Sequence, residues 1–599
     1  MGSSRIKERS EIDNKYKWDI EDMFPDESVI EDILAQVEKD ASDFTAYKGL
    51  LGSSAETLLE ALTARDHIWQ TLEKVMVYAR MRRDEDNRVA AYQAMTDRCG
   101  SIAAKVAAVT SFFTPELLEA SEDEIMKYVD SLEGLGTYRF YLSDVFRLKK
   151  HVLSKEEENI VAQLSEVTGA TGDIFTMLNN ADLTFGEIKD EKGNEVTLTH
   201  GNYIKFMESK ERSVRKDAFS HMYRPYMDLI NTVATTYNYN TKTDVVSARM
   251  RNYGSSLEAA LASDNIPLSV YDNLIDIVNE TLPVLYKYLD ARKKLLGVDE
   301  LHMYDIYVPL IDIPREDIPY EKGLDIIREA LKPMGSDYLE KMNSGLASGW
   351  VDVYENAGKT SGAYSFGSYD SKPYMLLNYA NTLQDVFTII HEMGHSMHSC
   401  YTRAHQPYIY GSHSIFTAEV ASTVNESLLM HHLISNAEDE DKRKYLINMH
   451  IEEFRTTLFR QTMFAEFEKL THEAAESGTV LTAEWLCDQY RMLNEKYFGS
   501  GVVSDEEIAY EWARIPHFYN AFYVYKYATG YSAATAISGK IISEGEKARD
   551  NYIEFLKTGE SDHPIELLKI AGVDMSSPEP VKQAMNTFKN LVDEFTKLV

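Results

Sequence analysis

The stretch that decides the fold is residues 381–395, which read NTLQDVFTIIHEMGH. Its early residues Thr382 and Asp385 have the spacing of a helix capping box. The apolar run that follows predicts a helix buried in the core. The two histidines and the glutamate of the HEMGH ending therefore fall on a buried helix.

These histidines have the spacing of a metal site. His391 and His395 are four residues apart, so they project from one helix face and can converge on one ion. Glu392 points elsewhere, where it can act as a general base on a water at the metal. The interior Gly394 costs about 1 kcal/mol relative to Ala, which indicates a packing or functional demand. The pattern predicts a zinc site rather than two core histidines.

A catalytic zinc also needs a third protein ligand and one open position. Residues 414–433, SIFTAEVASTVNESLLMHHL, predict a second apolar helix on which Glu419 and Glu426 share a face. We expect one glutamate to bind the metal and the other to contact a ligand histidine. His398, three residues after His395, is a competing ligand that spacing alone does not exclude.

Most of the remaining chain has the pattern of amphipathic helices. Residues 54–84, for example, place Leu58, Leu62 and Leu72 on one stripe. Similar patterns recur over 101–180, 205–250, 267–296, 322–346, 440–475 and 480–498. A chain of 599 residues exceeds the roughly 250–300 that one core fills. We expect an N-terminal helical lobe over 1–195 and a catalytic domain over 196–599.

Two segments have strand patterns instead. LTFGEIKDEKGNEVTLTH (183–200) alternates apolar and polar residues around a Gly-Asn turn and predicts a β-hairpin. Residues 361–382 predict two or three short strands before the HEMGH helix, and Pro373 favours an edge position for the strand that follows it. The sequence therefore predicts a mainly α protein with a small β-sheet beside the candidate site.

The overall composition narrows the class of partner and compartment. With 62 basic and 96 acidic residues the net charge is −34, which disfavours nucleic acid and anionic membranes as partners. Cys99, Cys400 and Cys487 are too few and scattered for a disulfide framework, which indicates a reducing compartment. No apolar leader and no long apolar window are present, so we expect a cytoplasmic protein without membrane spans.

Several ordered blocks of this sequence resemble one family. HEMGHSMH, FTAEVASTVNE and IPHFYNAFYVYKYATG resemble oligoendopeptidase F, a relative of thimet oligopeptidase. Blocks at the start, KWDIEDMF, and in the middle, MYDIYVPL and KTSGAYSFGSYDSKPYMLLNY, extend the resemblance over nearly the whole chain. It implies a two-lobed, helical, zincin-like peptidase with a deep substrate channel, one Zn²⁺ per chain and short peptides as substrates.

The resemblance also assigns roles to residues of the candidate site. By position it places the metal ligands at His391, His395 and Glu419 and the general base at Glu392. It places a supporting carboxylate at Glu426, beside a ligand histidine. This assignment favours Glu419 as the third ligand.

A second tract, residues 513–530, is dense in aromatic residues that bear hydroxyl groups. Aromatic residues at this density are usually core, although Tyr and His are suitable donors to an oxyanion. The resemblance matches His517 and Tyr525 to the family's oxyanion-side His and Tyr. Tyr519 is our match for the second family Tyr, and Phe518 aligns equally well.

The expected activity is hydrolysis of internal bonds in short peptides. One alternative is a dipeptidyl carboxypeptidase of related fold, which would release only C-terminal fragments. A second is a non-catalytic, zinc-stabilised peptide-binding protein. Glu392 separates the second from an enzyme, because a structural zinc site closes its fourth position with protein and needs no base.

Overall fold

The computed structural model describes residues 5–314 and 316–599. The chain divides into two compact units, each assembled from segments that are not consecutive. The first unit comprises Met1–Lys149, Arg315–His432 and Ile537–Val573, and the second comprises Lys150–Pro314, Leu433–Ala536 and Asp574–Val599. The predicted boundary at residue 195 instead divides the sequence into two continuous segments. That boundary stays a prediction.

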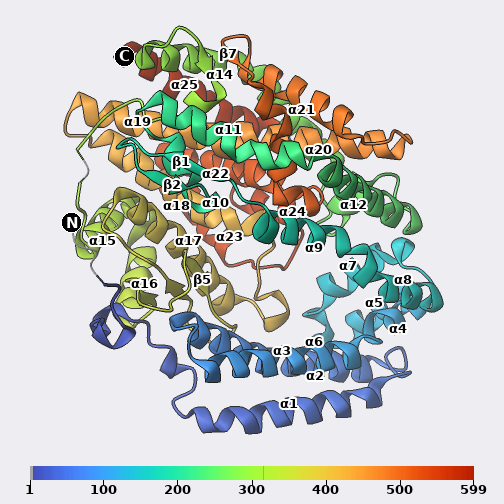
Figure 1. Ribbon diagram of the computed structural model, residues 1–599. Helices are drawn as coiled ribbons and strands as arrows, with labels where there is room; N and C mark the ends of the chain where they lie inside the picture. Colours follow the sequence, from blue (N-terminus) through green and yellow to red (C-terminus); the bar gives the residue numbers. More distant parts are fainter. Residues whose placement is uncertain (1–4, 315) are drawn as a thin grey trace. The chain divides into compact units, whose positions relative to one another are not determined.

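Both units are built mainly from α-helices, which confirms the predicted fold class (Figure 1). The longer helices of the first unit are α1 (Ile30–Phe44), α2 (Ala55–Glu85), α3 (Ala90–Thr110), α4 (Phe113–Glu119), α5 (Glu122–Ser131), α7 (Arg139–Arg147), α15 (Tyr320–Ala330), α16 (Gly335–Ala347), α17 (Leu383–His405), α23 (Glu546–Leu556) and α24 (Pro564–Ile570). Those of the second unit are α8 (Lys155–Thr168), α9 (Ala170–Met177), α10 (His200–Met207), α11 (Arg212–Asp228), α12 (Ile230–Met250), α13 (Ser256–Ala262), α14 (Leu268–Leu296), α19 (Glu440–Phe454), α20 (Arg460–Glu476), α21 (Ala483–Phe498) and α25 (Glu579–Leu598). Two helices, α18 (Ile415–Ser435) and α22 (Tyr525–Glu544), begin in one unit and end in the other.

In the first unit, α1, α2 and α3 run side by side, as the blue helices of Figure 1 show. Helix α2 begins where the Ser54 side chain accepts a hydrogen bond from the Thr57 N–H. Its stripe of Leu58, Leu62 and Leu72 is fully buried, as the sequence pattern predicts. Burial of such a stripe, rather than helix propensity, supplies most of the stability of a helix in a domain.

A three-stranded sheet lies in the same unit as the HEMGH helix. Its order is β4 (Val351–Asp352), β6 (Tyr374–Leu376), β5 (Tyr364–Phe366), with β4 parallel and β5 antiparallel to β6. The prediction that Pro373 marks an edge strand is wrong, because β6 is central. Pro373 precedes the first paired residue, so its missing N–H removes no bond from the ladder. The edge strand next to α17 is β5.

The predicted hairpin is confirmed in the second unit. Strands β1 (Glu187–Lys189) and β2 (Glu195–Thr197) pair antiparallel. Gly193 in the turn has φ 80°, a left-handed conformation that glycine adopts without strain. Elsewhere in this unit α14 packs against α20, α21 and α25.

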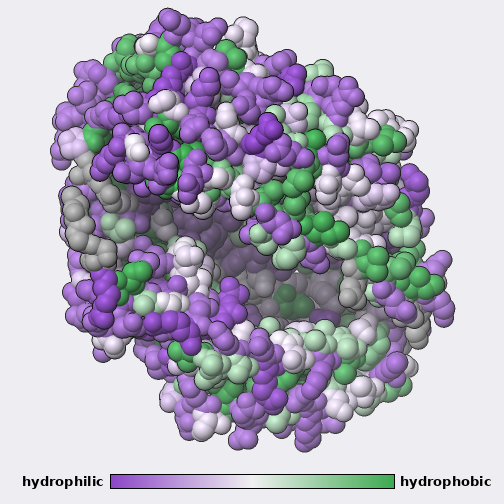
Figure 2. Space-filling view, in the orientation of Figure 1, coloured by the Kyte–Doolittle hydropathy of each residue, from purple (hydrophilic) through white to green (hydrophobic). Residues whose placement is uncertain are grey.

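The surface in view is mostly hydrophilic, with hydrophobic residues scattered over it (Figure 2). Such a surface is typical of a globular chain with a strong excess of acidic residues. Within residues 5–314 and 316–599, no helix combines the length and apolar character that crossing a bilayer requires.

Candidate metal centre

The helix that carries HEMGH begins at the predicted capping box. Thr382 Oγ1 accepts a hydrogen bond from the Asp385 N–H at 3.1 Å, and Asp385 Oδ2 accepts one from the Thr382 N–H at 2.8 Å. Two of the N–H groups that a helix start leaves unpaired are thereby satisfied. The apolar residues Val386, Ile389 and Ile390 are fully buried, so α17 is held in the core.

Three side chains in the first unit converge as a metal site would require. His391 Nε2 and His395 Nε2 are 3.2 Å apart, and Glu419 Oε2 lies 3.6 Å and 3.8 Å from them. One ligand atom from each residue lies within 4.8 Å of the others. Ligands about 2.0–2.2 Å from a tetrahedral zinc are separated by roughly 3.3–3.6 Å, and the three observed separations of 3.2, 3.6 and 3.8 Å lie close to that range. The donor set therefore fits a divalent ion.

Gly394 explains how Glu419 reaches the histidines. A Cβ at residue 394 would lie 2.5 Å from Ser422 Cα and 2.6 Å from the Ala421 carbonyl oxygen. Only glycine permits this contact between the backbones of α17 and α18. The packing demand that the sequence indicates is thus a close approach of the two helices, and it brings Glu419 to the HEMGH face.

The second glutamate of α18 contacts the other nitrogen of the same imidazole. Glu426 Oε1 lies 3.3 Å from His391 Nδ1, whereas Glu419 faces Nε2. Burial alone would lower the pKa of His391, but the hydrogen bond to Glu426 and the nearby carboxylates outweigh it and raise the pKa to about 9. A carboxylate in this position orients a ligand histidine and makes it more basic.

His395 is in a different electrostatic environment. Its ring hydrogen-bonds to the backbone of Ala418, which orients it toward His391. Burial and the positive charge on His391 lower the pKa of His395 to about 3, so this imidazole is neutral at physiological pH. Neutral imidazole is the form that binds a metal.

Glu392 lies beside this cluster and is largely buried, with 8% of its surface exposed. Its carboxylate accepts a hydrogen bond from the backbone N–H of Ser365 on the edge strand β5. Burial raises its pKa to about 7, and the negative charge of Glu419 contributes. A carboxyl group with a pKa near 7 can both take and return a proton at physiological pH.

His398, the competing ligand, does not join the cluster. Its side chain is buried, and its ring packs on His413 with centroids 3.7 Å apart and on Phe555 at 5.4 Å. Burial lowers its pKa well below the usual value. Among the described residues, the convergent group contains His391, His395 and Glu419 and does not include His398.

The other predicted site residues belong to the second unit, in residues 516–527, which we call the aromatic segment. His517 is exposed in a 3-10 turn (Pro516–Tyr519), and Tyr525 is completely buried at the start of α22. The Tyr519 ring stacks on Phe175 at 4.3 Å, and its buried hydroxyl has no hydrogen-bond partner among the described residues. The roles of these residues stay predictions.

Two neighbours of His517, Tyr523 and Tyr527, were not predicted as site residues. The rings of Tyr523 and Tyr527 lie 6.1 Å and 6.0 Å from the His517 ring and 5.5 Å from each other. Both tyrosines are partly exposed, so their hydroxyls are further candidate donors. Residue type alone could not separate them from Tyr525 in this Tyr-rich segment. Burial and the positive charge of Arg460 lower the pKa of His517.

A helical protein with a His-His-Glu cluster and a neighbouring glutamate has the fold and site of a metallopeptidase. The chain belongs to peptidase family M3: the family model matches residues 205–587, and a model described as oligopeptidase F matches residues 116–185. The chain is therefore a metalloendopeptidase.

Individual relatives agree over the full length. The oligopeptidase PepF of Bacillus subtilis is 46% identical over 597 residues, covering 100% of this chain and 89% of the relative. The crystal structure of a peptidase from Chlamydophila abortus matches with TM-score 0.91 and 36% identity, over 99% of this chain and 100% of that one. The crystal structure of oligoendopeptidase-F from Enterococcus faecium matches with TM-score 0.76 and 37% identity, over 95% and 99%.

Proposed function

We propose that this chain is a zinc-dependent endopeptidase that cleaves internal bonds of short oligopeptides. The observation that carries the proposal is the convergence of His391, His395 and Glu419 within 4.8 Å, with the buried Glu392 beside them. The names of its relatives, which specify oligopeptides, support the substrate class.

The proposed ligands are two imidazoles and one carboxylate, a set that suits zinc and leaves a coordination position for water or substrate. When bound, the ion supplies Lewis acidity, which polarises a carbonyl group and lowers the pKa of water. Glu426 holds the ring of His391, and the Ala418 backbone holds that of His395. Both imidazoles are thereby oriented before a metal binds.

Glu392 is the proposed general base. Its carboxylate removes a proton from the attacking water and later delivers that proton to the leaving amine. The Ser365 N–H fixes one end of this carboxylate, so Glu392 keeps its orientation through the cycle. Its pKa of about 7 allows both transfers near neutral pH.

The proposed oxyanion donors are His517 and Tyr525, by the family resemblance. Such donors hydrogen-bond the charge that develops on the carbonyl oxygen. Tyr519 is proposed as a weaker donor than these two, because its ring is held in a stack against Phe175.

The peptide main chain is proposed to lie along β5, the edge strand whose Ser365 N–H contacts Glu392. Pairing through the main chain would tolerate many side chains. The central strand β6 cannot serve, because β4 and β5 already pair with it. The cytoplasmic location stays a prediction.

The test is Glu392→Gln, with the exposed Glu119→Gln as a matched control. We expect Glu392→Gln to keep its zinc and to lose on the order of 10²–10⁴-fold in hydrolysis of an internally quenched peptide. Zinc is measured by elemental analysis on the same samples. Unchanged activity would refute Glu392 as the base, and absence of zinc in active protein would refute the metal.

A second measurement separates the alternatives. A peptide blocked at both ends is incubated with the enzyme, and its products are identified by mass spectrometry. An endopeptidase cleaves it at internal bonds. Cleavage that requires a free C-terminus and releases only dipeptides would instead identify a dipeptidyl carboxypeptidase.

A further inference from the structure

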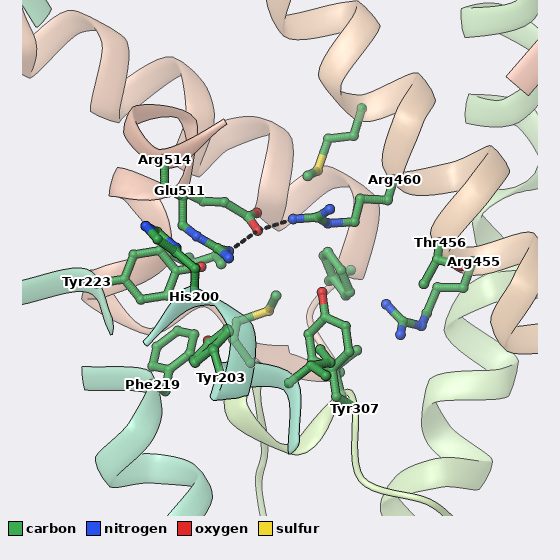
Figure 3. Close-up of a pocket in the computed structure, with 16 residues that line it drawn as sticks. His200, Tyr203, Phe219, Tyr223, Tyr307, Arg455, Thr456, Arg460, Glu511 and Arg514 are labelled. Atoms are coloured by element: carbon green, nitrogen blue, oxygen red, sulfur yellow. Dashed lines mark hydrogen bonds and ion pairs between the residues drawn. The ribbon is translucent and has the colours of Figure 1, made fainter. Parts of the chain in front are cut away.

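The second unit contains a cavity of about 240 Å³, and none of its lining residues belongs to the candidate metal cluster. Helices α10, α11 and α20 line it, together with a π-helical turn (Arg455–Phe459) and a 3-10 helix (Glu506–Arg514). Figure 3 shows arginine and tyrosine side chains directed into it. Nothing in the proposed peptide hydrolysis uses these residues.

Positive charge exceeds negative charge in this cavity. Arg460 donates a hydrogen bond to Glu511 at 2.5 Å, and Arg514 Nη1 lies 3.6 Å from the same oxygen. The other oxygen of Glu511 accepts a hydrogen bond from Tyr490 at 2.5 Å. One carboxylate therefore balances two guanidinium groups. In a chain with net charge −34, such a local excess of positive charge needs an explanation.

A third arginine lies at the other end of the cavity. Arg455 is held by Glu452, which accepts bonds from its Nε at 2.9 Å and its Nη2 at 2.6 Å. Its guanidinium lies over the Tyr307 ring, 5.0 Å from the centroid. It comes from the π-helical turn directly before α20, an irregularity that occurs frequently at functional sites.

Arg514 lacks acceptors among the described protein groups. Its only polar contact is the 3.6 Å ion pair with Glu511, and its buried Nε has no hydrogen-bond partner. Its guanidinium lies against the rings of Tyr203, at 5.3 Å, and Tyr223, at 5.7 Å. These aromatic contacts orient the planar group and leave its N–H edge free to bind a planar oxyanion.

The rest of the lining combines apolar residues, among them Phe219, Met303, Ile306 and Phe498, with tyrosines, His200 and Thr456. A purely structural cluster would account for the Arg460–Glu511 pair, which joins α20 to the 3-10 helix. It does not account for the unmatched donors of Arg514, because buried polar groups normally have partners. The combination of cationic donors and apolar walls matches a ligand that is anionic at one end.

We propose that this cavity binds a carboxylate carried on an apolar or aromatic body, with Arg514 and Arg460 as the anion-binding groups. The C-terminal residue of a peptide and a free aromatic acid share this chemistry. The inference does not rest on the peptidase mechanism, because every residue it uses lies outside the metal cluster and the aromatic segment.

The first test uses the unmodified protein and two probes, N-acetyl-phenylalanine and its uncharged amide. Calorimetry or ligand-observed NMR should show the acid binding at least tenfold more tightly than the amide. The difference should persist after treatment with a chelator. Equal affinities, no binding up to about 10 mM, or loss of binding on chelation would each overturn the proposal.

The second test changes the arginines. Arg514→Gln should weaken acid binding at least tenfold. Arg514→Lys keeps the positive charge but loses the planar, bidentate guanidinium, so its affinity for the acid should lie between those of Arg514→Gln and the unmodified protein. Arg491→Gln, at an exposed arginine of α21, is the matched control and should bind as the unmodified protein does. Arg460→Gln serves as a second variant if Arg514→Gln does not fold. Equal binding by the folded variant and the control would contradict the assignment.

The source of the carboxylate is separated with a tripeptide that ends in phenylalanine and resists cleavage through N-methylated bonds. Tighter, Arg514-dependent binding of this tripeptide than of N-acetyl-phenylalanine would identify a peptide C-terminus as the ligand. Tighter binding of the small acid would identify a free acid. If the binding of neither the tripeptide nor N-acetyl-phenylalanine depended on Arg514, the proposed site would be wrong.

Discussion

The metal centre and the aromatic segment obtain their geometry in different ways. In the metal centre, both histidines come from α17 and both glutamates from α18, and the two helix backbones touch at Gly394. The aromatic segment is irregular, and Phe522 within it has φ 56°, an outlier for a bulky residue. Regular helices position the first site, whereas specific contacts must hold the second.

One of those contacts is visible in the second unit. The Phe522 N–H donates to Glu468 Oε1 at 2.9 Å, and the Phe522 ring lies 4.4 Å from that of His472. Glu468 is fully buried, and burial raises its pKa well above the usual value. Strained backbone of this kind persists only where surrounding contacts hold it. We therefore expect substitutions in the metal centre to change metal affinity, and substitutions in the aromatic segment to change catalysis or stability.

The largest effect that distinguishes the two regions is on catalysis by the aromatic segment. We expect His517→Gln and Tyr525→Phe each to lower kcat by about 10²–10³-fold, because each removes a donor to the oxyanion. Zinc content should not change. Tyr519→Phe is the control and should have a much smaller effect. Wild-type kcat in Tyr525→Phe would show that another tyrosine, such as Tyr523, is the donor.

The next effect is on metal affinity alone. Glu426→Gln keeps an acceptor near His391 but removes the charge, so zinc affinity should fall about 10–100-fold. Because the pKa of His391 is raised to about 9, the metal-free protein carries a proton there at pH 7.5 and releases it when zinc binds. Calorimetry in two buffers of different ionisation enthalpy measures this release, which Glu426→Gln should reduce. Identical release would contradict the role of Glu426.

Gly394→Ala tests the backbone contact that builds the metal centre. The new Cβ would meet backbone atoms of Ser422 and Ala421, so α17 and α18 must separate, at a cost of about 1–3 kcal/mol in the free energy of unfolding. Zinc affinity should fall with it. Gly539→Ala in α22, where a Cβ meets nothing within 4 Å, is the matched control and should be neutral or slightly stabilising. Equal behaviour of the two variants would refute the packing argument.

The last effect concerns Glu468 and is confined to stability. Glu468→Ala leaves the Phe522 N–H without its acceptor and should cost about 1–3 kcal/mol in urea unfolding, without loss of zinc. Glu468→Gln should preserve the bond. Since burial raises the folded-state pKa, the stability linked to Glu468 is fully present below about pH 4.5 and falls as the pH rises toward that pKa. Glu468→Gln should therefore gain stability relative to wild type as the pH rises above about 4.5, and no such trend would contradict the raised pKa of Glu468.

Local spacing was sufficient for one part of the site. His391, Glu392 and His395 were predictable because helix periodicity alone places the two histidines on one face. The choice among Glu419, Glu426 and His398 was not, since it depends on how closely α18 packs on α17. The family resemblance favoured Glu419, and the distances agree with that choice.

The prediction of strands shows the same limit of local sequence patterns. Residues 361–382 were correctly expected to form short strands, but the position of Pro373 was misjudged. Proline excludes a residue from donating within a ladder, and it does not exclude the position just before a central strand. Strand order is set by pairing between distant segments, which no single strand encodes.

By itself, the sequence determined the helical class, the HEMGH helix and its cap, and the residue types of the candidate metal ligands. These follow from periodicity and residue chemistry within a few helical turns. Only the tertiary structure decided that Gly394 lets two helices touch, that Glu419 and Glu426 take opposite nitrogens of His391, and that arginines more than fifty residues apart, Arg455 and Arg514, line one cavity. Those arrangements arise from packing between segments far apart in the chain, where local patterns carry no information.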